Sequence, residues 1–144
     1  MGKGCEGMPQ RKIEAVLDTS ALYPMLKKLG GEAASLLPSL AVLDLTKYEL
    51  GNIVWKEHKL GHVKNWRGAI EQWSKIIREL PTYSIDAENL KEVEEIAAER
   101  DLSFYDASYI YVAEKLNLKL ITEDEGLLNK CKNSTSLDRF LKKA

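Results

Sequence analysis

Four acidic residues stand where apolar segments end or where the next helix begins: Asp18, Glu49, Asp106 and Asp124. Gathered in one place, such carboxylates repel one another by about 1 kcal/mol or more for each close pair at intermediate dielectric. Some of them must then be protonated unless cations neutralise them. Hard divalent ions such as Mg²⁺ or Mn²⁺ accept a purely oxygen ligand set. One or two such ions can activate a water molecule and stabilise a charged leaving oxygen, so this pattern is suited to metal-assisted hydrolysis.

Each acid alone also has a purely structural interpretation. Three pairs have the spacing of a helix capping box, in which an acid bonds back to the helix start: Thr46–Glu49, Ser103–Asp106 and Thr122–Glu125. Asp18 and Asp124 are equally suited to cap the helices that follow them. A shared site therefore depends on the fold bringing the four acids together.

The elements that must position these acids alternate between strands and helices. We expect strands at residues 13–17, 41–43, 82–85 and 118–122. We expect helices at residues 20–29, 46–59, 63–80, from 86 onward, 105–116 and 124–130, with a small edge strand and a last helical turn within 134–141. This alternation predicts a parallel sheet covered by helices on both faces. Ligands of such sheets bind outside the carboxyl ends of the strands, where all four acids are expected.

Four motifs in order carry a family resemblance. They are Val-Leu-Asp-Thr-Ser at 16–20, Thr-Lys-Tyr-Glu-Leu-Gly-Asn at 46–52, Leu-Ser-Phe-Tyr-Asp-Ala at 102–107 and Leu-Ile-Thr-Glu-Asp at 120–124. Together they resemble the PIN-domain nucleases, and most of all the single-domain VapC-like toxins of prokaryotic toxin–antitoxin systems. The resemblance spans residues 13–137, nearly the whole chain.

The resemblance implies an α/β, PIN-like three-layer fold, with a small parallel sheet of order 3-2-1-4-5 wrapped by helices. It implies a Mg²⁺- or Mn²⁺-dependent ribonuclease that forms a homodimer and is inhibited by an antitoxin protein. The residues that match the family's catalytic and metal-binding acids are Asp18, Glu49, Asp106 and Asp124. Those that match its supporting polar residues are Ser20, Asn52 and Thr122. One departure is the pair Glu123 and Glu125, which makes the rim acidic where the family often has a basic residue.

Binding of RNA phosphates requires cations near these acids. The candidates follow Glu49 along the chain: Lys47, Lys56, Lys59, Lys64 and Arg67. A solvated helix face is the alternative interpretation of these five residues. The amphipathic helix at 63–80 carries Trp66 and Trp73, which favour core packing over a dimer surface or an aromatic platform for RNA.

Composition limits the classes of protein that remain. The 144 residues carry 21 basic and 22 acidic side chains, so no overall basic field attracts nucleic acid. No apolar run approaches 20 residues, which excludes a membrane protein and favours the cytoplasm. Cys5 and Cys131 lack zinc-site spacing, and Cys131 is expected to be buried. Residues 1–10 are expected to be a disordered tail or a cloning remnant, and residues 11–144 a single PIN domain.

These observations favour a metal-dependent endoribonuclease, the toxin of a toxin–antitoxin pair. The alternative within the family is a PIN-domain protein that acts in RNA processing or binds RNA without a toxin role. A phosphoacceptor signalling domain also places acids at strand ends, but only Asp86 follows the third expected strand and no suitable lysine accompanies it. For the antitoxin, we expect a groove between apolar residues at 22–26 and a helix at 33–37.

Overall fold

The sheet of this computed structural model, which describes residues 12–29, 35 and 37–143, has five parallel strands. Their order is β3-β2-β1-β4-β5, which confirms the predicted order 3-2-1-4-5. The strands are β1 (Ala15–Leu17), β2 (Leu40–Leu43), β3 (Thr82–Tyr83), β4 (Lys119–Ile121) and β5 (Ser134–Thr135). All are short, so the sheet serves as a compact base for the loops and helices at its carboxyl edge.

The central strand β1 fixes the position of the first acid. Val16 pairs with Ala41 of β2 on one side and with Leu120 of β4 on the other. All three residues of β1 are fully buried, as expected of a strand covered on both faces. The backbone N–H of Asp18 donates to the carbonyl of Ile121 at 3.1 Å, so the β1–β4 ladder continues to the acid itself.

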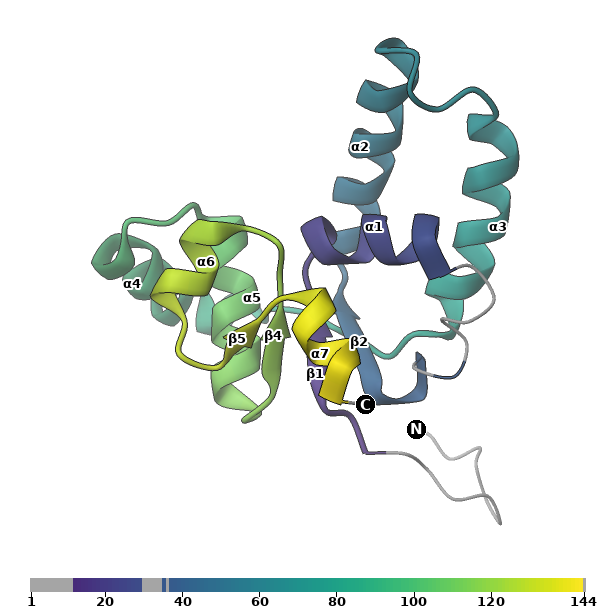
Figure 1. Ribbon diagram of the computed structural model, residues 1–144. Coiled ribbons are helices and arrows are strands. Elements are labelled where there is room, and N and C mark those ends of the chain that lie inside the picture. The colour runs from purple at the N-terminus through teal and green to yellow at the C-terminus, as the bar shows by residue number, and fades with distance from the viewer. Residues whose placement is uncertain (1–11, 30–34, 36, 144) are drawn as a thin grey trace.

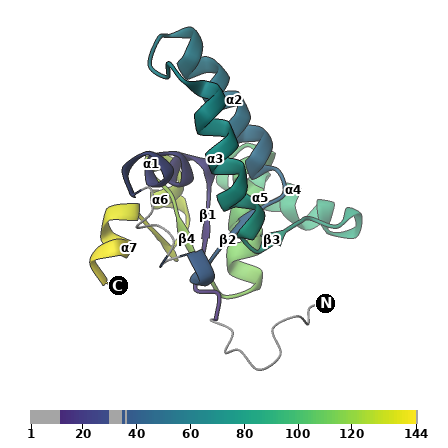
Figure 2. The same ribbon diagram turned by 90° about the vertical axis from the view of Figure 1, so that its right-hand side faces the viewer.

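Seven α-helices cover the two faces of the sheet in the described part of the chain. They are α1 (Thr19–Leu29), α2 (Thr46–Lys59), α3 (Trp66–Glu79), α4 (Leu90–Arg100), α5 (Phe104–Lys115), α6 (Glu125–Lys130) and α7 (Leu137–Lys143), with short 3₁₀ helices η2 (Leu37–Ser39) and η3 (Ala87–Asn89). Helices α1, α2 and α3 lie to one side of the sheet and α4, α5 and α6 to the other (Figure 1). The far ends of α2 and α3 extend together away from the sheet (Figure 2).

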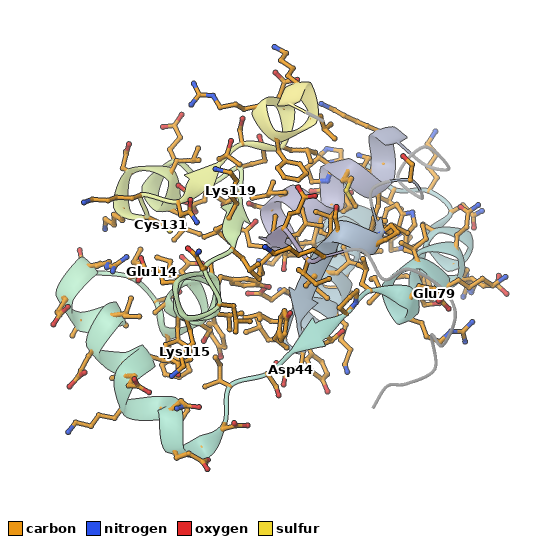
Figure 3. All side chains as sticks on the ribbon, turned by 90° about the horizontal axis from the view of Figure 1, so that it is seen from below. Asp44, Glu79, Glu114, Lys115, Lys119 and Cys131 are labelled. Atoms are coloured by element: carbon orange, nitrogen blue, oxygen red, sulfur yellow. The ribbon has the colours of Figure 1, made fainter. Side chains whose placement is uncertain are left out.

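Two apolar layers hold this arrangement together. One joins α1, α2, α3 and α7 to the sheet through residues such as Leu22, Leu50 and Phe140. The other joins α5 and α6 to the opposite face through residues such as Ile110 and Leu127. Seen from below, side chains fill the space on both sides of the sheet (Figure 3). The sheet is therefore the middle of three layers, as the PIN-like fold requires.

Helix α3 is shorter than predicted but plays the expected part. It spans Trp66–Glu79 rather than 63–80, because the Asn65 side chain caps it by accepting the Gly68 N–H at 3.1 Å. Trp73 is 9% exposed and belongs to the core, as the apolar periodicity indicates. Trp66 is only partly buried, since it lies nearer the outer end of the helix pair.

The region after β3 departs from the expectation of a single helix. A 3₁₀ turn, η3, comes first, α4 begins only at Leu90, and Asp86 makes no side-chain capping bond. Cys131 is buried, which confirms that expectation. Cys5 and residues 1–10 lie outside the described residues. No helix in the described ranges is long and apolar enough to cross a membrane.

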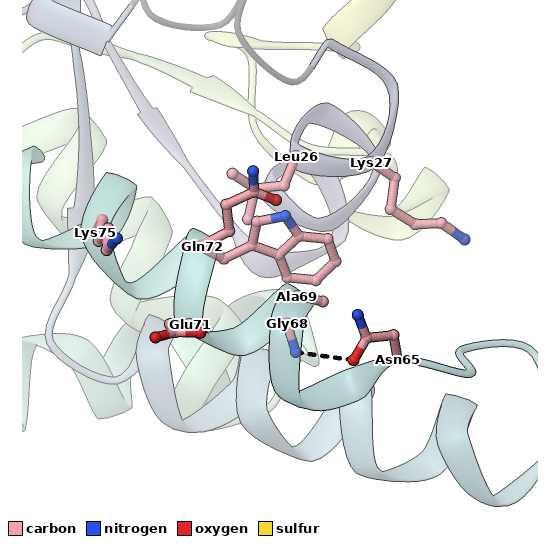
Figure 4. A pocket seen from close by; sticks show the side chains of 9 residues that line it. Leu26, Lys27, Asn65, Gly68, Ala69, Glu71, Gln72 and Lys75 are labelled. Atoms are coloured by element: carbon pink, nitrogen blue, oxygen red, sulfur yellow. Dashed lines mark hydrogen bonds between the residues drawn. The ribbon is translucent and has the colours of Figure 1, made fainter.

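The prediction that residues 22–26 line an antitoxin groove is wrong for most of these residues. Leu22 and Met25 are fully buried and Leu26 is 3% exposed, because they form the core layer beneath α1. Residues 33, 34 and 36, the other wall of that groove, lie outside the part of the chain that the structure describes. A pocket with a volume of about 780 Å³ does open between α1 and α3, but none of the four acids lines it (Figure 4).

Candidate active site

Asp18 is the most deeply buried of the four acids, at 5% exposed. Its Oδ1 accepts hydrogen bonds from Ser20 Oγ at 2.6 Å and from the Ala21 N–H at 3.1 Å. Its Oδ2 accepts from Thr122 Oγ1 at 2.5 Å, so residues after β1 and after β4 hold one carboxylate. Ser20 and Thr122, two of the three expected supporting residues, thus contact the first acid directly.

Burial sets the acidity of this carboxyl group. It raises the pKa of Asp18 from its ordinary value of 3.8 to about 6, because a desolvated charge is disfavoured. The hydrogen bonds from Ser20 and Thr122 oppose that rise, and the nearby charge of Asp106 adds to it. The negative charge of Asp18 is therefore not paired with a basic side chain among the residues that the structure describes.

Glu49 lies in the first turn of α2 and is half-buried. Its Oε1 accepts from Thr19 Oγ1 at 2.6 Å and from the Tyr109 hydroxyl at 2.9 Å. Burial raises the pKa of Tyr109 above its ordinary value. The capping-box interpretation of Thr46–Glu49 is wrong, because Leu45 occupies the N-cap position and no side chain caps α2.

Asp106 lies in the first turn of α5, and Asp124 is the N-cap residue of α6. Ser103 caps α5 by accepting the Asp106 N–H at 3.0 Å, which agrees with the capping pattern there. Asp124, rather than Thr122, caps α6 by accepting the Leu127 N–H at 3.1 Å. The exposed Asp124 still acts on its neighbour, since its charge helps to raise the pKa of Asp106.

Asp106 connects the four acids electrostatically. Burial raises its pKa first, followed by the charges of Asp124 and Glu49. Asp106 in turn raises the pKa of Asp18. The fold therefore brings the other three predicted acids close enough to Asp106 for electrostatic interaction, at the carboxyl edge of the sheet.

The chemistry of this donor set fits a hard divalent cation. The three close pairs of opposite charge among the described residues are His62–Glu57, Arg100–Glu114 and Lys142–Asp138, and none includes a site acid. Oxygen-only donors with an uncompensated negative charge suit ions of the Mg²⁺ or Mn²⁺ type. In the described ranges, no three acid, histidine or cysteine side chains are arranged to hold an ion, so binding would draw the acids together.

The remaining predicted residues lie outside this hydrogen-bonded group. Asn52 is exposed on α2, and no hydrogen bond joins it to the acids among the residues described. The five candidate RNA-binding residues, Lys47, Lys56, Lys59, Lys64 and Arg67, are also exposed. Three of these cations lie over aromatic rings: Lys47 over Tyr48 at 5.4 Å, Lys59 over Trp55 at 4.8 Å and Arg67 over Trp66 at 4.5 Å.

Of the two acids expected at the rim, Glu123 and Glu125, the first makes a hydrogen bond within the protein. Glu123 Oε2 accepts the Leu137 N–H at 2.7 Å, at the start of α7. The Glu123 N–H donates to Ser20 Oγ, which links the same loop to the site. Glu123 therefore joins α7 to the loop after β4, and both Glu123 and Glu125 are exposed.

Three residues near the acids escaped the sequence analysis: Thr19, Thr46 and Tyr109. Thr19 adjoins Asp18 within the first motif, and Thr46 was interpreted only as a cap. Tyr109 follows Asp106 by three residues, so both face the same side of α5. That spacing was the one signal available for Tyr109, and it also fits an ordinary core aromatic residue.

Known proteins share much of this sequence. The sequence matches the PIN domain family over residues 15–133. Exonuclease VapC9 of Pyrobaculum aerophilum is 39% identical over 129 residues, which cover 90% of this chain and 94% of that protein. Ribonuclease VapC3 of the same organism is 30% identical over 125 residues, covering 82% of this chain and 95% of that protein.

Solved structures share the architecture. The crystal structure of PAE2754 from Pyrobaculum aerophilum has a TM-score of 0.82 and 38% identity, covering 91% of this chain and 88% of that one. A toxin–antitoxin complex from Klebsiella pneumoniae has a TM-score of 0.55 at 18% identity, covering 85% of this chain and 97% of that one, which shows the fold alone. Motifs, topology and relatives agree, and the chain belongs to the PIN domain family.

Proposed function

We propose that this protein hydrolyses RNA phosphodiester bonds with the help of a Mg²⁺ or Mn²⁺ ion. The observation that carries the proposal is the position of Asp106. Its pKa is raised by burial and then by the charges of Asp124 and Glu49, while no described basic side chain pairs with any of the four acids. Such a site is stabilised by a cation and, without one, repels the phosphate that it would cleave.

Asp18, Glu49, Asp106 and Asp124 would hold the ion in this proposal. A bound divalent ion supplies an activated water and neutralises charge on the phosphate. Ser20 and Thr122 orient Asp18 through the bonds described above. Ser20 donates its hydroxyl proton to Asp18 and accepts the Glu123 N–H, so in this proposal it positions that carboxylate.

The nucleic acid and the position of cleavage are part of the proposal. One relative is named a ribonuclease and another an exonuclease, so the family relationship supports nuclease activity without fixing where the strand is cut. We propose internal cleavage of RNA. Residues 46–67 carry five basic and two acidic side chains in a chain of net charge −1, which favours this segment for the phosphate backbone.

The biological setting is also a proposal. Both relatives are named VapC, which supports a toxin role. We propose a homodimer in the cytoplasm whose activity an antitoxin protein blocks. The alternative is a PIN-domain protein of RNA processing, which would need no inhibitor. Light scattering tests the assembly: twice the chain mass of 16.3 kDa is expected at micromolar concentration, and a single chain mass would contradict the homodimer.

Cleavage of matched linear and circular RNAs of one sequence tests the activity. With Mn²⁺ or Mg²⁺ we expect both forms to be cut, because internal cleavage needs no free end. Excess chelator should abolish both reactions. Cutting of the linear form alone would identify an exonuclease, and equal cutting in chelator would contradict the metal-assisted reaction.

A further inference from the structure

We propose that Tyr109 is a positioning residue that, together with Thr19, fixes Glu49 with one carboxylate oxygen left for a metal ion. This inference rests on the proposed function, because it concerns how the same site holds its ion. Tyr109 lies on α5, three residues after Asp106, while Glu49 lies on α2. The contact therefore joins two helices that each supply one acid.

The hydrogen bonds run in one direction from the sheet to the acid. The Leu43 N–H, at the end of β2, donates to Thr46 Oγ1 at 3.1 Å. Thr46 Oγ1 and the Tyr109 hydroxyl lie 2.6 Å apart, and the Tyr109 hydroxyl donates to Glu49 Oε1 at 2.9 Å. Because Tyr109 has a single hydroxyl proton, which goes to Glu49, Thr46 must be the donor to Tyr109.

Thr19 completes the arrangement from the other side. Its Oγ1 donates to the same oxygen, Glu49 Oε1, at 2.6 Å. Thr46 is fully buried, Tyr109 is 1% exposed and Thr19 is 5% exposed. A buried hydroxyl that loses its partner is costly, so these three hydroxyl groups stabilise one arrangement of the glutamate.

The two oxygens of Glu49 are consequently unequal. Oε1 accepts two hydrogen bonds, whereas Oε2 accepts none from any residue that the structure describes. The Glu49 charge also reaches Asp106, since it contributes to the raised pKa of that residue. We infer that Oε2 is the ligand atom and that Oε1 anchors the side chain.

Two variants remove the two donors to Oε1 separately, and a third serves as the matched control. Tyr109→Phe keeps the ring and removes its hydroxyl, and Thr19→Val keeps the shape and removes the other donor. Tyr111→Phe removes a hydroxyl from the same helix that also contacts a glutamate, Glu92 at 3.3 Å, away from the site. Calorimetric titration of the full chain with Mn²⁺, without RNA, gives the dissociation constant of each.

Partners that orient a metal ligand typically change affinity or activity by about 10- to 100-fold. We therefore expect Tyr109→Phe to weaken Mn²⁺ binding by about 10-fold, with Thr19→Val changing it in the same direction and Tyr111→Phe matching wild type. At saturating Mn²⁺, kcat on RNA should fall for Tyr109→Phe while KM stays within about 2-fold of wild type, because the RNA-binding surface is untouched.

Two results separate failure of this inference from failure of the proposed function. Wild-type protein that cleaves RNA with Mn²⁺, together with Tyr109→Phe and Thr19→Val proteins of unchanged Mn²⁺ affinity, overturns the positioning role alone. Wild-type protein that neither binds Mn²⁺ nor cleaves RNA overturns both. If Tyr109→Phe fails to fold, Thr19→Val decides the question, since it leaves the Thr46–Tyr109–Glu49 chain intact.

Discussion

Asp18 shows how one residue can be well hydrogen-bonded and still destabilise its own charged form. Ser20, Thr122 and the Ala21 N–H all donate to its carboxylate, yet burial outweighs them and raises its pKa to about 6. A carboxyl group with a raised pKa in the folded state binds more protons than in the unfolded state. Its contribution to stability is thus fully present below about pH 3.8 and is lost as the pH rises through 6.

The first prediction concerns the pH dependence of stability in chelator. The shift in Asp18 pKa corresponds to about 3 kcal/mol of unfolding free energy lost between pH 4 and pH 7. Asp18→Asn should remove that part of the pH dependence and equal or exceed wild-type stability at pH 7. Urea unfolding at pH 4, 5, 6 and 7 measures it, and parallel curves for the two proteins would contradict the burial argument.

Sequence reasoning at this scale identified the acids but not the groups that hold Glu49. The four motifs predicted that each acid lies just after a strand or at the start of a helix, and the structure has each acid in such a position. Thr46 had the spacing of a capping box with Glu49, but its hydroxyl pairs instead with Tyr109, 63 residues away. Local spacing cannot predict such a partner, since it depends on how α2 and α5 pack across the sheet.

Two glycines inside helices allow the helix preference of alanine to be compared with the effect of neighbouring side chains. Gly51 and Gly68 both lie inside helices, in α2 and α3. An added Cβ at Gly51 would meet no atom within 4 Å, whereas at Gly68 it would lie 2.5 Å from the Asn65 side chain that caps α3 (Figure 4). The same substitution is therefore expected to have a larger stabilising effect at Gly51 than at Gly68.

Gly51→Ala should stabilise the protein by about 0.5 to 1 kcal/mol, because alanine favours helix and reduces the entropy of the unfolded chain. Gly68→Ala should lack that gain, because the new methyl group displaces the Asn65 cap, whose loss costs about 1 kcal/mol and offsets the helix preference of alanine. Thermal unfolding in chelator measures both changes. An equal gain in both variants would show that the cap contributes nothing to α3.

At the element scale, apolar periodicity predicted the position of a helix but not the surface against which its apolar face packs. The apolar stripe of α3 was found to within three residues, and Asn65 explains its later start. The groove expected at residues 22–26 failed because Leu22, Met25 and Leu26 face the sheet. An apolar helix face has the same sequence pattern whether it packs on the core or awaits a partner.

The whole molecule gathers four acids at one edge of a small sheet, so we expect its stability to depend on cations. A ligand that binds only the folded state adds RT ln(1 + [L]/Kd), or about 2.7 kcal/mol at one hundred times Kd. The four acids come from four separate segments of the chain, so an ion held by them would join both helical layers. Ion binding should consequently raise the stability of the entire fold.

We expect the melting temperature of wild-type protein to rise with Mn²⁺ and that of Asp106→Asn to rise much less. Asp138→Asn is the control, because Asp138 is exposed and pairs only with Lys142 on α7 among the described residues. Differential scanning fluorimetry with and without Mn²⁺ measures all three proteins. The same rise in Asp106→Asn as in wild type would show that the ions bind elsewhere.

The central claim is that the acids around Asp106 make this PIN domain a metal-dependent ribonuclease. The most direct measurement is the single-turnover cleavage rate of one labelled RNA by wild type, Asp18→Asn and the Asp138→Asn control at saturating Mn²⁺. We expect wild type and control to cleave equally, and Asp18→Asn to be at least about 100-fold slower while remaining folded. Wild-type cleavage by Asp18→Asn would contradict the site described here.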